Sequence, residues 1–191
     1  MKKNLLIAIW MTIVTTVLLG LIYPLVVTGL AQALFPRQAN GELIHENGKL
    51  VGSRLLGQPF SSRGYFVSRP SAAGPAGYDP TQSGGSNYAA TNKALLDRVS
   101  ADVAKFHSQN PNALIPADLV TASASGLDPH VSPASAEFQV PRVARERGMG
   151  ETELRALVRT HTEGRQLGFL GEPRVNVLAL NLDLDAHHPI H

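Results

Sequence analysis

One uncharged apolar segment near the start of the chain constrains the fold most. Between Lys3 and Arg37 the sequence contains no Asp, Glu, Lys or Arg, and its centre is rich in Leu, Ile and Val. A helix of roughly 20 apolar residues is long enough to cross the hydrocarbon core of a bilayer. Pro36 should end the helix, because proline lacks the N–H that a continuing helix uses. The sequence therefore predicts a transmembrane helix over residues 5–35.

A cleaved signal peptide is the alternative interpretation of this segment. Lys2 and Lys3 resemble its basic start, and Ala31-Gln32-Ala33 resembles a cleavage site. The apolar region of a signal peptide is about 7–15 residues long, and the apolar run here is considerably longer. Its length favours a retained anchor.

Four residues of the anchor are candidates for contact with other membrane helices: Thr12, Thr16, Gly20 and Pro24. Small and hydroxyl-bearing residues allow close packing between helices in a bilayer. Membrane helices also tolerate proline when other groups satisfy the freed carbonyl. The alternative is that the threonines, with Thr15, bond only to carbonyls of their own helix.

The orientation follows from the length of the head rather than from charge. Basic residues lie on both sides of the apolar segment, so the positive-inside rule does not decide it. Residues 1–4 are too few for a translocated domain, so we expect this head in the cytoplasm. Residues 36–186 are then expected in the periplasm of a bacterium, anchored to its inner membrane, and residues 187–191 form a flexible tail. The absence of cysteine permits an oxidising compartment but does not require one.

The charge of the remaining chain argues against nucleic-acid binding. The protein has 17 Lys and Arg against 15 Asp and Glu, so removing Lys2 and Lys3 leaves a formally neutral domain. A nucleic-acid-binding domain usually carries a basic face. About 150 residues is the size of one ordinary domain.

Patterns along residues 36–186 indicate both strands and helices. Asn47-Gly48 between two short apolar runs predicts a β-hairpin. Apolar residues at helical spacing predict a helix that ends before Pro111. A second amphipathic helix is expected from Gly150 to Thr162, with Gly164 as its stop. This mixture predicts an α+β fold.

Three further boundaries involve proline. Pro116–Leu119 is expected to begin a short helix, and Ser132-Pro133 to cap the next one. Pro141 should interrupt or end that helix. Residues 175–184 stay ambiguous, because alternating leucines fit a strand whereas Glu172-Pro173 fits a helix start.

A serine hydrolase is one functional alternative. Ser123 or Ser125 could act with His130, and Asp118 or Asp128 could complete a triad. The serines lack the Gly-x-Ser-x-Gly turn that exposes a nucleophile. Capping and turning of the backbone by these side chains is the simpler interpretation.

The histidines near the end of the chain raise the question of a metal site. His187, His188 and His191 are metal-ligand types, but their place at the terminus favours a mobile tail. We predict no metal site and no firmly bound cofactor.

The loop from Ser83 to Asn87 (Ser83, Gly84, Gly85, Ser86 and Asn87) is a candidate contact site for a nucleotide or a partner. Its small residues could present backbone N–H groups to an anion. They could also let the chain approach a partner closely, or simply lead into the next helix with Ser86 or Asn87 as its N-cap.

Several blocks of the sequence are informative when taken together. They are Val51-Gly52-Ser53 with Gly57-Gln58-Pro59-Phe60, Tyr65-Phe66-x-x-Arg69-Pro70-Ser71, Ser83–Asn87, Asp118–His130 with Ser132-Pro133, Gln139-x-x-Arg142-Val143-Ala144-x-x-Arg147-Gly148, and Leu170–Leu178. In order and spacing, from the anchor nearly to the end of the chain, they resemble a known family, the C subunit of the bacterial potassium-transporting ATPase, the Kdp pump.

The resemblance implies a non-catalytic subunit of an inner-membrane complex. Its partners would be a channel-like A subunit that carries potassium, a P-type B subunit that hydrolyses ATP, a small F subunit, and the lipid bilayer. The family is described as a catalytic chaperone that raises the affinity of the B subunit for ATP. With the domain outside, ATP would be reached only through the complex, and any effect on it would be indirect.

Overall fold

The computed structural model describes residues 1–46 and 48–190, and the chain divides into two compact units. Met1–Val51 holds a long apolar helix and most of a β-hairpin, and Gly52–His191 holds a mixed domain of helices and short strands. This confirms an α+β fold with an N-terminal apolar helix. The placement of the domain outside the membrane stays a prediction.

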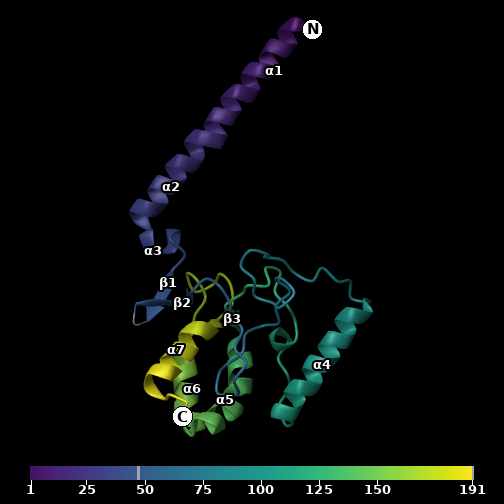
Figure 1. The fold of residues 1–191 in the computed structure, drawn as a ribbon, viewed down its shortest axis with the longest axis vertical. Coiled ribbons are helices and arrows are strands. Elements are labelled where there is room, and N and C mark those ends of the chain that lie inside the picture. The colour runs from purple at the N-terminus through teal and green to yellow at the C-terminus, as the bar shows by residue number, and fades with distance from the viewer. Residues whose placement is uncertain (47, 191) are drawn as a thin grey trace. The chain divides into compact units, whose positions relative to one another are not determined.

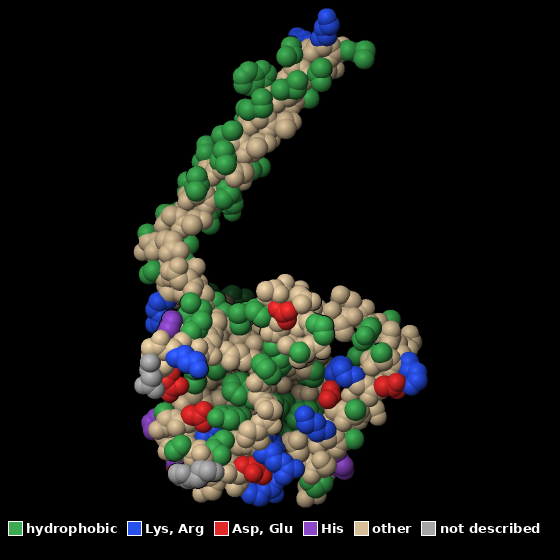
Figure 2. Space-filling view, in the orientation of Figure 1, with side chains coloured by type: hydrophobic (Ala, Val, Ile, Leu, Met, Phe, Trp, Pro, Cys, Tyr) green, Lys and Arg blue, Asp and Glu red, His purple; other side chains and the backbone are tan. Residues whose placement is uncertain are grey.

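The anchor is one continuous helix made of α1 (Lys2–Thr15), η1 (Thr16–Ile22) and α2 (Tyr23–Leu34) (Figure 1). It is 33 residues long, has a mean hydropathy of 2.5 and buries none of its surface inside the protein. Figure 2 shows hydrophobic side chains along its length. Among the described residues it is the one helix long and apolar enough to span a membrane. A short helix, α3 (Pro36–Ala39), begins at the proline predicted to stop it.

Pro24 alters the geometry of the anchor without ending it. The seven residues of η1, just before it, form a π-helix. Proline supplies no N–H to the carbonyl four residues earlier, that of Gly20, and its ring crowds that turn. A locally widened turn relieves both problems, and such turns are a known cause of helix bending.

The predicted hairpin is confirmed. β1 (Leu43–Glu46) and β2 (Lys49–Ser53) pair as a two-stranded sheet. Gly48 has a φ of +76°, which is the left-handed conformation that a tight hairpin turn requires. Asn47, the other turn residue, lies outside the described residues.

A long stretch without helix or strand, residues 54–92, leads to α4 (Lys93–Gln109). It contains the candidate contact loop, Ser83–Asn87. The side chain of Asn92 caps α4 by accepting a hydrogen bond from the N–H of Ala94 at 2.8 Å. α4 ends before Pro111, as predicted. The next element is a single 3₁₀ turn, η2 (Ala117–Leu119).

A small antiparallel sheet lies at the centre of the second unit. Its order is β3 (His130–Val131), β5 (Arg174–Asn176) and β4 (Thr162–Glu163), with β5 in the middle. Val175 is paired with Val131 on one side and with Thr162 on the other. Three strands that are separate in the sequence therefore meet at Val175.

The prediction that Pro141 interrupts or ends its helix is wrong. α5 (Pro133–Arg147) continues through it, beginning at the predicted cap, Ser132. Val140 and Val143, on either side of the proline, are fully buried. An interior proline costs about 3 kcal/mol, and burial of each such side chain returns about 1.5–3 kcal/mol. Tertiary packing thus holds the helix together across the proline.

Gly164 does not stop the amphipathic helix, which ends earlier. α6 (Glu151–Thr160) buries Leu154 and Val158, as an amphipathic pattern requires. β4 then begins at Thr162, because the chain is drawn into pairing with β5. Strand pairing therefore sets this boundary.

The ambiguous C-terminal segment is both strand and helix. β5 comes first, and α7 (Val177–His187) follows directly. Asn176 caps α7 by accepting from the N–H of Ala179 at 3.0 Å, so the helix does not start at Glu172-Pro173. Leu180 and Leu184, one helical turn apart, are both fully buried. The alternating leucines suggested a strand, but the segment is a helix. Leucines four residues apart lie on the same side of a helix, and that side faces the core.

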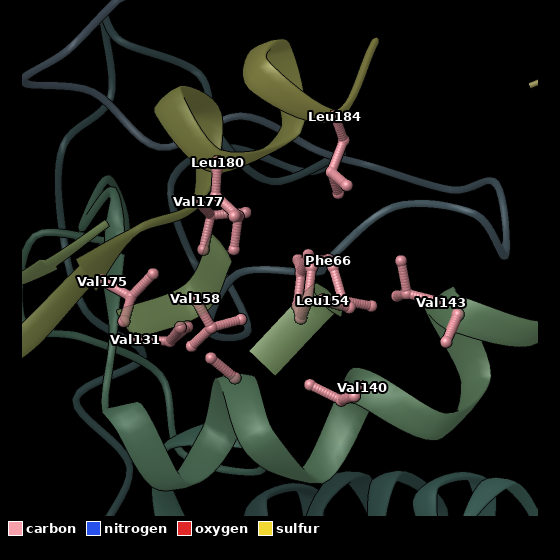
Figure 3. Close-up of a cluster of buried hydrophobic side chains, with 12 residues drawn as sticks. Phe66, Val131, Val140, Val143, Leu154, Val158, Val175, Val177, Leu180 and Leu184 are labelled. Carbon is pink, nitrogen blue, oxygen red and sulfur yellow. The ribbon is translucent and has the colours of Figure 1, made fainter. Parts of the chain in front are cut away.

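One hydrophobic core joins α5, α6, α7 and the sheet (Figure 3). Phe66 enters it from the irregular stretch before α4 and is completely buried. The members of this core are Phe66, Val131, Ala136, Val140, Val143, Ala144, Leu154, Val158, Val175, Val177, Leu180 and Leu184.

Side-chain amides hold the backbone around Phe66. Asn181 accepts from the N–H of Phe66 and donates to its carbonyl, both at 2.9 Å. Gln139 does the same for Val67, at 2.8 and 3.2 Å. Buried backbone groups must be paired, and here α5 and α7 supply the partners that a neighbouring strand would otherwise provide.

A buried arginine fixes the residues just before Phe66. Arg142 donates to the carbonyls of Arg63 and Tyr65, and to Gln139 at 2.8 Å. Burial lowers the pKa of Arg142 to about 10. The group nevertheless stays charged at neutral pH, and the carbonyl oxygens satisfy much of that charge.

Candidate functional site

The loops that carry the recognised sequence blocks meet around Arg69. Its guanidinium donates to the carbonyls of Thr121 and Ala122, both at 3.3 Å, and pairs with Asp128 at 3.2 Å. We call Arg69 with these three residues the Arg69 junction. Pro70 favours an extended backbone at Arg69, which helps to carry the side chain from its own loop to the next. The junction joins segments more than 50 residues apart in sequence.

Asp128 is held as a carboxylate by this arrangement. One oxygen pairs with Arg69, and the other accepts from the backbone N–H of His130 at 3.0 Å. Burial alone would raise the pKa of Asp128. Hydrogen bonds from His130 and the nearby guanidinium outweigh it, so the pKa lies below its ordinary value.

Asp118 performs a different structural task. Its carboxylate accepts from the N–H of Ser132 at 2.7 Å and from the hydroxyls of Ser132 and Ser135. It therefore binds the first turn of α5, where the partial positive charge of a helix N-terminus stabilises an anion. All of these partners are structural, which leaves Asp118 no role in a triad.

Two shallow grooves flank the Arg69 junction. One has a volume of about 560 Å³ and the other about 510 Å³. Arg69 and Asp128 line both of them. The first is otherwise lined by Ala117, Asp118, Thr121, His130, Val131, Ser132, Glu172, Pro173 and Arg174, and the second by Leu55, Leu56, Ser83, Ser123, Ala124, Ser125, Leu127 and Pro129.

A second crossing of loops lies beside the junction. Ser71 donates to the carbonyl of Gly126 at 2.6 Å and accepts from the N–H of Tyr78 at 2.7 Å. The hydroxyl of Tyr78 donates to the carbonyl of Arg69, and burial raises the pKa of Tyr78. These bonds fold residues 69–79 into a compact loop that is anchored at both ends.

The predicted contact loop, Ser83–Asn87, is pinned to the segment of Ser125. The N–H of Gly84 donates to the carbonyl of Ser125 at 2.8 Å, and the hydroxyl of Ser83 donates to the same oxygen at 3.1 Å. Asn87 has a φ of +52°. The N-cap role considered for Ser86 or Asn87 is wrong, because Asn92 caps α4. Contact of this loop with a nucleotide or a partner stays a prediction.

Gly126, not Gly84 or Gly85, has the strictest need for glycine. Its φ is +66°, and a Cβ there would lie 2.7 Å from both the N of Ala73 and the O of Gly84. Neither Gly84 nor Gly85 has a left-handed φ, and a Cβ on Gly84 would meet nothing closer than 3.9 Å. A Cβ on Gly85 would come within 3.2 Å of the carbonyl oxygen of Ala124, which is tight but open to adjustment.

The geometry offers no support for a serine nucleophile. Ser123 and Ser125 lie 3.4 Å apart, Oγ to Oγ, and Ser125 accepts from the N–H of Leu127. Among the described residues no hydrogen bond joins either hydroxyl to His130. His130 instead lies beside Asp128, with 3.5 Å between its Nδ1 and the carboxylate. The serines act in turns, which was the simpler interpretation.

Two of the C-terminal histidines have partners in the domain, and the flexibility of the tail stays a prediction. His187 is the last residue of α7 and lies 2.8 Å from Asp183, and the carbonyl of His188 accepts from Arg147 at 2.6 Å. His191 lies outside the described residues. Within residues 1–46 and 48–190 no group of three metal-ligating side chains comes together.

On the anchor, two threonine hydroxyls bond to their own helix. Thr12 donates to the carbonyl of Ala8 at 2.9 Å, and Thr15 to that of Met11 at 2.8 Å. This is the alternative considered for them. Gly20 has only Thr16 near it, at 3.8 Å from a built Cβ, so its surface is open to a close neighbour. Packing of this surface against other helices stays a prediction.

Sequence reasoning did not assign a site role to Arg69 or Gly126. Both lie in blocks that carried the family resemblance, and the Arg-Pro pair in a glycine-rich loop was a usable signal. Their roles depend on partners more than 40 residues away, which spacing does not reveal. The arrangement has fixed charges and locked loops but no paired nucleophile and base, so it suits a rigid contact surface.

We predict that Gly126→Ala destabilises the protein far more than Gly84→Ala. The left-handed backbone and two backbone contacts at 2.7 Å should together cost at least about 2 kcal/mol at Gly126. At Gly84 the change should stay within about 0.5 kcal/mol. Thermal unfolding of both purified variants measures the difference, and equal stability would contradict the role assigned to Gly126.

The family model described as "K+-transporting ATPase, c chain" matches residues 5–186. The chain is 63% identical over 190 residues to the potassium-transporting ATPase KdpC subunit of Koribacter versatilis, covering 100% of this chain and 98% of that protein. It is 57% identical over 183 residues to the KdpC subunit of Geobacter sulfurreducens, covering 95% and 97%. The match includes both the anchor and the domain. The chain therefore belongs to the KdpC family, the c chain of the K⁺-transporting ATPase.

Proposed function

We propose that this chain is the non-catalytic accessory subunit of a high-affinity, ATP-driven potassium uptake complex. The observation that carries the proposal is the match of the family over residues 5–186, which takes in the apolar helix and nearly the whole domain. The match therefore covers both the apolar helix expected in the membrane and the domain that follows it. The accessory role is to assemble and stabilise the pump.

The division of labour agrees with the chain's chemistry. Its sequence has no Asp-Lys-Thr segment to be phosphorylated and no glycine-rich loop ending in Gly-Lys-Ser or Gly-Lys-Thr. The anchor carries no Asp, Glu, Lys, Arg or His between Lys3 and its end at Leu34. One such helix offers an ion no path of its own. ATP hydrolysis and potassium conduction therefore belong to partners.

We propose that these partners are a channel-like A subunit that carries potassium, a P-type B subunit that hydrolyses ATP, and a small F subunit. The anchor would pack against them in the bilayer through the face formed by Thr12, Thr16, Gly20 and Pro24. The absence of a side chain at Gly20 supports this, because close approach of helices in lipid relies on small residues.

The chain would raise the affinity of the B subunit for ATP by coupling rather than by contact. The Ser83–Asn87 loop is the candidate nucleotide surface. However, the N–H of Gly84 is already used by Ser125, which removes one of the donors that an anion would need. Coupling between two sites requires only that each favours the same state of the complex.

We place the head in the cytoplasm and the domain in the periplasm, with the anchor crossing the inner membrane once. One helix among the described residues, Lys2–Leu34, is long and apolar enough to cross a membrane, and the matching family is a chain of a K⁺-transporting ATPase.

The first prediction concerns the anchor face. Gly20→Ile should strongly reduce copurification of the pump subunits with the tagged chain, because a branched side chain would hold the neighbouring helix away. Gly29→Ile is the matched control, since it lies in the same helix nine residues further along, on a different side, and also faces open space. Equal recovery of the complex with both variants would argue against this face.

The second prediction concerns ATP. Removing the chain from the complex should weaken ATP binding by the B subunit, and the isolated full-length chain should show no calorimetric ATP binding at micromolar concentrations. Gly85→Val in the assembled pump distinguishes contact of the Ser83–Asn87 loop with a partner from contact with a nucleotide. Weakened assembly or coupling in this variant supports the proposal, whereas normal assembly together with tight ATP binding by the isolated chain would refute it.

The third prediction concerns orientation. The protein has no cysteine, so single cysteines can be labelled without background. In cells with a permeabilised outer membrane, an impermeant maleimide should label Leu114→Cys, at a side chain that is 95% exposed. It should leave Asn4→Cys, the matched control in the head, unlabelled until lysis. The reverse pattern would overturn the orientation.

A further inference from the structure

The loop that joins β4 to β5 ends in an apolar tip, residues 166–170. Leu167, Phe169 and Leu170 are 82%, 69% and 48% exposed there. The tip contains no charged residue. Single exposed apolar side chains are common on protein surfaces, but three within four positions at the end of one loop form a contiguous patch that calls for a partner.

The backbone of the apolar tip is already hydrogen-bonded within itself. Gln166 and Leu170 exchange two N–H···O bonds of 2.9 Å each. The N–H of Phe169 donates to the carbonyl of Gln166 and that of Gly168 to the carbonyl of Arg165, both at 3.2 Å. Unpaired backbone groups are what usually keeps a loop out of hydrocarbon. Four of the five N–H groups of the tip are paired in this way, which lowers the cost of leaving water.

The turn itself places a leucine where a smaller residue is usual. Leu167 and Gly168 have φ values of +53° and +82°. Turns with two such residues strongly prefer Asn-Gly, and a leucine in this conformation is strained. In this strained turn the apolar side chain of Leu167 lies at the apex of the loop, where it contributes nothing to the core.

Charged residues form a collar at the base of the tip. Arg165 pairs with Glu172 at 2.6 Å across the neck of the loop. Just below, Glu163 pairs with Arg54 at 2.8 Å and with Arg174 at 3.0 Å. An uncharged tip above a charged collar is the arrangement expected where a loop enters the membrane surface and its base stays in water or among headgroups.

Chain connectivity limits how far this collar can lie from the membrane. The stretch from the end of the anchor at Leu34 to the start of β1 at Leu43 spans at most about 30 Å when extended. The hairpin then turns back, so Ser53 ends near the strand that begins at Leu43. The next residue, Arg54, is the one bound to Glu163.

We propose that the apolar tip inserts into the surface of the same bilayer that the anchor spans, with lipid as its partner. The inference goes beyond the proposed function and holds for either orientation of the chain, because the tether follows the end of the anchor. A second contact with lipid would hold the domain at one height above the membrane and restrict its rotation about the tether.

The test uses the full-length chain with an environment-sensitive fluorophore on Phe169→Cys, reconstituted alone in phosphatidylethanolamine–phosphatidylglycerol vesicles. Leu114→Cys carries the same label as a control, because it replaces another exposed apolar side chain, in the separate loop between α4 and η2. We expect a blue shift at position 169, and loss of emission when some lipids carry a nitroxide near the headgroup. Neither change should occur at position 114.

A second variant shows whether the apolar character is the cause. Leu170→Asp, added to the labelled Phe169→Cys chain, should abolish both the shift and the quenching while leaving the unfolding temperature unchanged. Four outcomes would overturn the proposal: no quenching by lipid at position 169, equal quenching at position 114, a shift that appears only in the assembled pump, or a shift that appears only at high chain density. The last two conditions would assign the tip to a partner subunit or to a second copy.

Discussion

The backbone from residue 63 to residue 67 runs through the domain without a neighbouring strand, and side chains of two helices take the strand's place. Asn181 from α7 and Gln139 from α5 bond to both the N–H and the carbonyl of Phe66 and Val67. Arg142 bonds to the carbonyls just before them. Without these bonds, burying the ring of Phe66 would leave several backbone groups unpaired, each at a cost of about 1–3 kcal/mol.

That threaded segment also sets where the Arg69 junction forms. Arg69 follows Val67 by two residues, so its position is fixed by bonds that α5 and α7 make. From there it reaches the carbonyls of Thr121 and Ala122 and the carboxylate of Asp128. The loops on both sides become rigid without belonging to a sheet. A surface built this way suits a subunit that must present one shape to its partners, because little order remains to be gained on binding.

The anchor and the apolar tip express the same physical constraint, the cost of placing backbone in lipid. The anchor satisfies its peptide groups through helical bonds, and even at Pro24 it widens a turn rather than opening the chain. The tip satisfies most of its groups by folding Gln166 onto Leu170. Both elements show apolar side chains outward over a closed backbone, which is the general requirement for contact with a bilayer.

Much of this protein was determined by the sequence alone, wherever a local pattern was sufficient. The uncharged run, the hairpin at Gly48 and the helix that Asn92 caps all depend on neighbours within a few residues, and the family resemblance rested on order and spacing. Tertiary structure decided the rest. Pro141 stays inside a helix because buried residues surround it, and the leucines near the end form a helix because their spacing of four meets the core. Gly126 needs its lack of a side chain because Ala73 and Gly84 approach it from distant loops, a contact that no local pattern contains.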